Sequence, residues 1–130
     1  DELTTLIPND AKVMFHGGVS DETYANLLAD DAIMVSASLA EGFGLPLAEA
    51  LMLGVPAVVS ERPFFREIAG SEGAMYADPT NPKLFADAIM LLDDLAVRQR
   101  YIAGGKFAVS KFTWETSAKI LLTACQELSR

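Results

Sequence analysis

The sequence is poor in the residues that build disulfides, zinc sites and catalytic triads. Among 130 residues there is one cysteine, one histidine and one tryptophan. Cys125 cannot form a disulfide within the chain, which fits a reducing compartment, so we expect a cytoplasmic location. The lone histidine, His16, argues against a zinc site and against a Ser-His-Asp triad. The function must therefore rest on other chemistry.

Positive charge and long apolar runs are also scarce. Ten Lys and Arg residues against 18 Asp and Glu give a net charge of −8. No basic face is left to displace counterions from phosphates, so we predict that the chain does not bind nucleic acid. No apolar run approaches the ~18 residues of a membrane-spanning helix. The sequence thus argues against a nucleic-acid-binding protein and against a span within these residues.

What is present is a hydrophobic content of 51% spread along the chain in alternating strand-like and helix-like segments, which indicates one α/β domain over residues 1–130. The predicted strands are Lys12–His16, Ala32–Ala37, Val55–Ser60 and Ala74–Ala77. The first four predicted helices begin after Ser20, run from Pro46 to Gly54, span Pro63–Ala69 and begin after Asn81. Two more span Leu95–Ala103, where Gly104-Gly105 ends the helix, and Trp114–Leu128, which Thr113 precedes. Strands with apolar residues on both faces favour a parallel sheet covered on both sides.

Helical spacing also predicts which side chains form the core. The helix after Pro46 should bury Leu47, Ala48, Leu51 and Met52, and the helix after Asn81 should bury Leu84, Ala88, Leu91 and Leu92. We expect Phe64 and Phe65 to lie in the core rather than to form a ligand platform. Trp114 should pack the last helix onto the body.

The most informative segment is Glu41–Glu49, with the sequence EGFGLPLAE. It follows a predicted strand, and in open α/β sheets the loops after the carboxyl ends of strands form the ligand crevice. Gly42 and Gly44 permit backbone conformations and close approaches that a side chain would prevent. Pro46 begins a helix whose free N–H groups and dipole face the same crevice. The segment is therefore the candidate binding site.

We expect both carboxylates of this segment to face one pocket, Glu41 from the loop and Glu49 from the first helical turn. Carboxylates suit sugars and ribose, because a vicinal diol can donate two O–H hydrogen bonds to one carboxylate. Phosphates would bind instead to the backbone N–H groups of Gly44, Leu45 and the helix start. Taken singly, the residues have plainer explanations, an acid near a helix N-terminus and glycines in a turn. The nine-residue pattern as a whole favours a site.

The stretch EGFGLPLAEALMLGVPAVVS resembles the signature of retaining GT-B glycosyltransferases of the group 1, or family 4, type, which include bacterial mannosyl- and glucosyltransferases, sucrose synthase and glycogen synthase. The family's E-x7-E pair matches Glu41 and Glu49. The blocks VMFHGGVSDETY, DDAIMVSAS and REIAG…YADP stand in the family's order, and the resemblance extends from about Ala11 to FTWE at Phe112–Glu115. It implies a Rossmann-like parallel sheet with helices on both faces, the C-terminal, donor-binding domain of such an enzyme.

The resemblance also implies roles for individual residues. Glu49 would hold the ribose hydroxyls, and Glu41 would act as the catalytic-site carboxylate, beside the anomeric carbon of the transferred sugar. Val19 matches a position whose backbone meets the nucleobase edge, although a plain strand-to-helix turn would also explain it. The implied substrate-binding residues are Val19, Gly42, Phe43, Gly44, Leu45, Pro46 and Glu49.

Two departures from the family pattern stand out. Ala37 occupies a position where the family often has proline, which concerns only the stiffness of the loop. The phosphate-clamping Arg and Lys of the family belong to a segment before this chain begins. Arg62 and Arg66 are candidate anion contacts, but solvated arginines would explain them as well.

The resemblance further implies a sheet in the order 3-2-1-4-5-6, in which the strands predicted here are the third to the sixth. The first two, absent from this chain, would lie between Lys12–His16 and Ala32–Ala37. Unpaired backbone at that place is costly, so we expect one of two arrangements. Either these two strands pair directly, or a second chain covers the exposed edge in a homo-oligomer.

The resemblance therefore implies a hexosyltransferase domain that binds a UDP- or GDP-sugar for retaining transfer without metal or cofactor. No D-x-D motif is present, which argues against the metal-dependent GT-A type. The acceptor would bind a separate N-terminal domain, which could also bring the protein to a membrane, and the chain alone should transfer no sugar. The alternatives are a nucleotide-sugar-binding module without catalysis and a flavodoxin-like or receiver-like domain that matches the signature by chance. The overall pattern leans toward mannosyl-type enzymes of surface-polysaccharide assembly.

Overall fold

The computed structural model describes residues 7–8, 10–29 and 31–128. Its elements, in chain order, are α2 (Asp21–Ala29), β1 (Met34–Ser36), α3 (Leu45–Leu53), β2 (Ala57–Ser60), α4 (Pro63–Ala69), β3 (Met75–Ala77), α5 (Pro82–Leu91), α6 (Leu95–Val109) and α7 (Trp114–Leu128). The strands form a parallel sheet in the order β1-β2-β3, with Met34 opposite Ala57 and Val58 opposite Met75. The predicted α/β class with a parallel sheet is confirmed.

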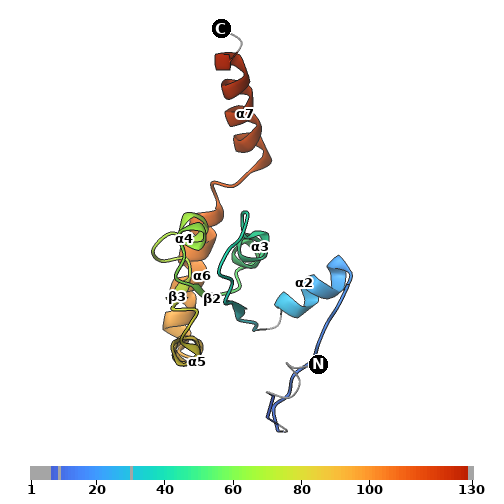
Figure 1. The fold of residues 1–130 in the computed structure, drawn as a ribbon, viewed down its shortest axis with the longest axis vertical. Coiled ribbons are helices and arrows are strands. Elements are labelled where there is room, and N and C mark those ends of the chain that lie inside the picture. The colour runs from blue at the N-terminus through green and yellow to red at the C-terminus, as the bar shows by residue number, and fades with distance from the viewer. Residues whose placement is uncertain (1–6, 9, 30, 129–130) are drawn as a thin grey trace.

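Two apolar clusters pack against opposite faces of the sheet. Ala57 and Val59 of β2 face α3, α4 and the end of α6, in a cluster that includes Leu47, Phe65 and Val109. The intervening residue, Val58, faces the other cluster, which α5 and the first half of α6 complete. Because side chains alternate along a strand, the apolar run of β2 fills both faces. Helices therefore cover both sides of the sheet, as predicted (Figure 1).

Most helix ends lie at the residues that the sequence indicates. The Ser20 hydroxyl accepts from the Thr23 N–H at 3.2 Å, and the Asn81 side-chain oxygen accepts from the Lys83 N–H at 3.1 Å. The Thr113 hydroxyl accepts from the Thr116 N–H at 3.1 Å before α7. Gly54 ends α3 with φ 81°, in the left-handed region that favours glycine. These caps confirm the predicted starts and stops.

The predicted break at Gly104-Gly105 is wrong, because α6 continues through both glycines to Val109. A Cβ on Gly104 would lie 2.3 Å from the Glu72 carbonyl oxygen, and one on Gly105 would lie 2.7 Å from Leu51 Cδ2. The two glycines thus let α6 approach the Glu72–Gly73 turn and α3. Tertiary packing here outweighs the low helix propensity of glycine.

The predicted core stripes are shifted. In α5, Leu84 and Leu91 are 44% and 58% exposed, whereas Phe85 is buried and Ala88 is packed against the core as predicted. In α3, Met52 is 49% exposed, and Ala50 is buried in addition to the predicted Leu47, Ala48 and Leu51. Adjacent residues of a helix point in different directions, so the sequence leaves open which of two adjacent apolar residues faces the core. The packing of the helix against its neighbours decides this. The buried Phe65 and the adjoining Phe64 confirm the core prediction for that pair.

The predicted strand at Lys12–His16 is not formed. These five residues have no assigned secondary structure and all are exposed. The prediction that they pair directly with Ala32–Ala37 is therefore wrong. Among the described residues β1 pairs with β2, and Val35 in β1 is 48% exposed. A segment becomes a strand only when its backbone bonds to a neighbouring strand, and Lys12–His16 makes no such pairing with the open edge of β1. Coverage of the β1 edge by a second chain stays a prediction.

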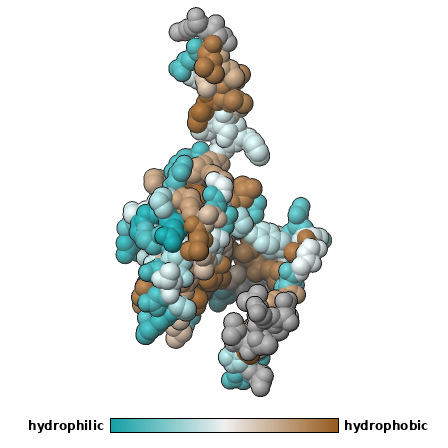
Figure 2. Space-filling model, in the orientation of Figure 1, coloured by the Kyte–Doolittle hydropathy of each residue, from teal (hydrophilic) through white to brown (hydrophobic). Residues whose placement is uncertain are grey.

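In Figure 1, α7 extends from the top of the body and α2 lies to the right of it, in contact with α3. Neither has a buried residue. Trp114 is 93% exposed, so the prediction that it packs α7 onto the body is wrong. Figure 2 shows hydrophobic surface on α7. Ile120, Leu121 and Leu122 of this helix are each more than 60% exposed. No helix among the described residues is both long and apolar enough to cross a membrane.

Candidate functional site

The candidate site lies at the carboxyl ends of the strands. Ser60, the last residue of β2, is fully buried, and its hydroxyl donates to the Ser36 carbonyl at the end of β1 at 3.4 Å. The loop of residues 37–44 leaves β1 at this edge and leads into α3. In open α/β sheets this edge carries the ligand. The loop therefore has the position that the sequence predicts for it.

Gly44 at the end of this loop is required by its backbone and by its packing. It caps α3 with φ 91° and ψ 46°, a conformation that side chains disfavour. A Cβ there would lie 3.0 Å from Ile68 Cδ1 and 3.5 Å from Phe65 Cε1 in α4. The loop is thus pressed against α4, and this contact fixes where α3 begins.

The start of α3 offers two free backbone donors. Pro46 has no N–H, and the N–H groups of Leu47 and Ala48 both donate to the Gly44 carbonyl, at 3.1 and 3.3 Å. The N–H groups of Gly44 and Leu45 have no backbone acceptor among the described residues. A phosphate at this helix start would bind to these two groups, since the helix dipole favours an anion there.

Both signature carboxylates lie on the open side of this unit. Glu41 and Glu49 are exposed, while Leu47, Ala48 and Leu51 on the opposite side of α3 are at most 3% exposed. The predicted direction of Glu49, away from the core, is thus what the structure shows. Each carboxylate can accept hydrogen bonds from a diol without leaving a buried charge behind.

Tyr24 of α2 lies near Glu49, which the sequence analysis missed. Tyr24 is half-buried where α2 contacts α3. Burial raises the pKa of its phenol, and the charge of Glu49 raises it further. Spacing within one helix could not have shown this contact, because it depends on how α2 and α3 pack. Val19 precedes α2 by one residue, Ser20, and is exposed.

A cavity of about 520 Å³ adjoins the signature. It is lined by Phe43, Leu45, Ala48, Glu49, Met52, Phe112, Thr113, Trp114 and Ser117. The rings of Phe43 and Phe112 meet edge to face, with centroids 5.3 Å apart. The structure thus brings Phe43, Leu45 and Glu49 together. Glu41, Gly42 and Val19 do not line this cavity.

The two candidate anion contacts have different surroundings. The guanidinium of Arg66 donates twice to the Glu61 carboxylate, at 2.6 Å each, and lies over the Tyr76 ring. These hydrogen bonds from Arg66 lower the pKa of Glu61. Arg62 is half-buried, and its Nε has no hydrogen-bond partner. Arg66 is thus occupied, and Arg62 retains unused donors.

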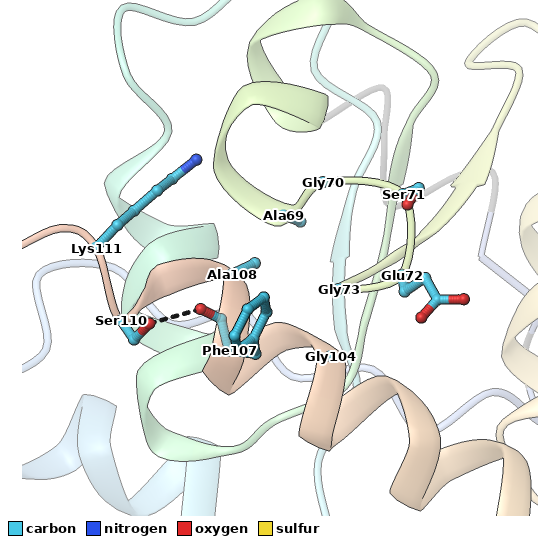
Figure 3. Close-up of a pocket in the computed structure, with 10 residues that line it drawn as sticks. All are labelled: Ala69, Gly70, Ser71, Glu72, Gly73, Gly104, Phe107, Ala108, Ser110 and Lys111. Atoms are coloured by element: carbon cyan, nitrogen blue, oxygen red, sulfur yellow. Dashed lines mark hydrogen bonds between the residues drawn. The ribbon is translucent and has the colours of Figure 1, made fainter.

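A further hollow of about 420 Å³ lies between the Ala69–Gly73 turn and the second half of α6 (Figure 3). Gly104 lines it, and the Ser110 hydroxyl donates to the Phe107 carbonyl at its rim at 2.7 Å. No residue of the Glu41–Glu49 segment contributes to its lining. This hollow is therefore not part of the candidate site.

The pattern of the family described as "Glycosyl transferases group 1" matches residues 3–106, most of the chain. The chain belongs to this family. It is 34% identical over 111 residues to the serotype-specific mannosyltransferase WbdA of Escherichia coli, covering 85% of this chain and 13% of that protein. It is 35% identical over 104 residues to the O-antigen chain mannosyltransferase B of E. coli, covering 79% of this chain and 27% of that protein.

Solved structures agree on the fold. The sucrose-phosphate synthase of Thermosynechococcus elongatus superposes with a TM-score of 0.76 at 24% identity, over 88% of this chain and 30% of that chain. At this identity the likeness shows the fold alone, and it confirms the Rossmann-like arrangement of a GT-B domain. The chain spans less than a third of the length of each of these three proteins. The family and fold predictions are thereby confirmed.

Proposed function

We propose that this chain binds the nucleotide-sugar donor, a UDP- or GDP-sugar, of a retaining, metal-independent glycosyltransferase. The observation that carries the proposal is the placement of Glu41 and Glu49. Both carboxylates are exposed at the carboxyl edge of the sheet, on either side of the two free N–H groups at the start of α3. Acceptors for hydroxyls thus stand beside donors for phosphate, and a nucleotide sugar needs both.

The site would act by positioning and electrostatics. Glu49 holds the ribose diol, and the Gly44 and Leu45 N–H groups stabilise the departing diphosphate. The backbone of Gly42 and Phe43 and the start of α3 at Pro46 orient the sugar, and Glu41 faces the positive charge that develops at the anomeric carbon. No covalent step on a side chain and no metal or other cofactor is required. The assignment of Val19 to the nucleobase is part of this proposal.

The names of the relatives bear on the donor and the setting. WbdA and the O-antigen chain enzyme are mannosyltransferases, and the second is named for O-antigen chains. These names favour a mannosyl donor and surface-polysaccharide assembly. A cytoplasmic location, with attachment to a membrane through a further domain, is part of the proposal. The acceptor would bind a further domain, a part of the relatives' length that this chain does not cover.

The second candidate is a nucleotide-sugar-binding module without catalysis. The scarcity of available cations favours it, because a departing diphosphate needs positive charge. Among the described arginines, Arg66, Arg98 and Arg100 are engaged in ion pairs. Both candidates predict donor binding. A transfer assay on a form of the protein that includes the acceptor-binding domain separates them, because only the enzyme transfers sugar.

The test is calorimetric titration of this chain with GDP, UDP and the corresponding nucleotide sugars. Glu49→Ala removes the acceptor for the ribose diol, so it should weaken nucleotide and nucleotide sugar equally, by about tenfold or more. Glu41→Ala should weaken only the nucleotide sugar, because Glu41 faces the hexose. Glu127→Ala, an exposed glutamate near the end of α7, is the matched control. If neither signature variant differs from this control, the carboxylates are structural and the proposal fails.

A further inference from the structure

Arg62 differs from the other described arginines in having no hydrogen-bond acceptor. Arg66 pairs with Glu61, Arg98 with Asp31 and Arg100 with Glu72. The Arg62 Nε is fully buried and lacks any hydrogen-bond partner, and its guanidinium forms no ion pair with the described residues. Buried polar groups are nearly always paired, so an unpaired one calls for an explanation.

The position of Arg62 suggests the missing partner. Arg62 follows β2 by two residues, at the carboxyl edge of the central strand. It lies one helical turn before Phe65, whose ring is 3.5 Å from the place of a Cβ on Gly44. Arg62 thus begins the helix whose buried face packs against the end of this loop, at Gly44.

Asp78, whose charge Arg62 influences, does not hydrogen-bond to the guanidinium. Asp78 follows β3 at the same edge, and its Oδ1 accepts from the Thr80 N–H and hydroxyl at 2.8 and 2.7 Å. These two hydrogen bonds account for most of the lowering of the Asp78 pKa, and the attraction of Arg62 adds a smaller part. Asp78 thus attracts Arg62 only weakly, and no hydrogen bond or ion pair joins the two side chains.

We propose that Arg62 is a further donor-binding residue, which contacts the diphosphate held by the Gly44 and Leu45 N–H groups. This inference rests on the proposed function. A guanidinium presents N–H groups in a planar fork that matches phosphate oxygens, and it keeps its charge at any physiological pH. The side chain is half-buried, and of its three guanidinium nitrogens only Nε is buried without a partner. The two terminal nitrogens are therefore the ones that an anion can reach. The chain has a net charge of −8, and Arg62 would supply positive charge to the diphosphate from within this sequence.

The test compares Arg62→Gln and Arg62→Lys with Arg66→Gln in calorimetric titrations of this chain. The probes are GDP, UDP, their nucleosides and inorganic pyrophosphate. Arg62→Gln should weaken both nucleoside diphosphates and pyrophosphate by about tenfold or more, and leave the nucleosides within twofold. Arg62→Lys should fall between, because it keeps the charge and loses the fork. Arg66→Gln should change nothing, since Glu61 already occupies that guanidinium.

The outcomes separate this inference from the proposed function. If Glu49→Ala weakens the nucleotides and Arg62→Gln does not, Arg62 is no ligand and the donor site still stands. If Arg62→Gln weakens diphosphates and nucleosides alike, its effect is on the fold, and the inference is overturned. Thermal melting of each variant checks the same point independently. If the unaltered chain binds none of the nucleotides or pyrophosphate, both proposals fail.

Discussion

The body of the molecule, made of the sheet and α3 to α6, differs from the two flanking helices α2 and α7 in how its apolar side chains are covered. Every buried apolar residue lies between residues 47 and 109 of the described chain. The helices α2 and α7, outside this range, bury no residue, although α7 carries a row of apolar side chains (Figures 1 and 2). The body buries a core and still exposes apolar side chains such as Met90, Leu95 and Phe107, whereas α7 leaves its whole apolar face in solvent. An amphipathic pattern thus indicates a helix without indicating what covers it.

Shortening a buried side chain of the core should destabilise the body. Leu51 is 1% exposed and packs against the position of Gly105 in α6. Leu51→Ala should lower the free energy of unfolding by about 2–5 kcal/mol, from lost burial and the cavity left behind. Urea unfolding followed by circular dichroism measures this. A loss below about 1 kcal/mol would mean that α3 and α6 do not form the core of the chain in solution.

The same kind of change in α7 should have little effect. Trp114 is 93% exposed, so Trp114→Ala should shift the free energy of unfolding by no more than about 0.5 kcal/mol. The same urea experiment measures it, with Leu51→Ala as the contrast. A loss comparable to that of Leu51→Ala would show that Trp114 is covered in solution, by the body or by a second chain.

The features that the sequence predicted well are those decided by local chemistry. Caps at Ser20, Asn81 and Thr113 and the left-handed glycines at Gly44 and Gly54 depend on a few neighbouring residues. The place of the Glu41–Glu49 segment, between β1 and the start of α3, could be predicted because a strand, a loop and a helix start follow one another directly. Nothing far away in the sequence was needed for these predictions.

The features that it missed depend on partners distant in sequence. Lys12–His16 has a strand-like composition, but a strand forms only beside another strand. In the sequence, Gly104 suggests the end of a helix. Only the fold shows that Glu72 lies against it, where a side chain would not fit. The free guanidinium of Arg62 could not be distinguished from that of Arg66, because only the fold shows that Glu61 engages Arg66. The proximity of Tyr24 to Glu49 likewise comes from packing.

The most direct test of the donor site is an NMR titration of this chain, labelled with ¹⁵N, with GDP and UDP. The account predicts that amide shifts change at Gly42, Gly44 and Leu45 and near Glu49, in the body, while those of α7 beyond its first turns stay unchanged. Glu49→Ala should reduce the changes at the same nucleotide concentration. Shifts confined to the separate hollow between Ala69–Gly73 and α6, or no shifts with either nucleotide, would contradict the claim that the Glu41–Glu49 segment binds the donor.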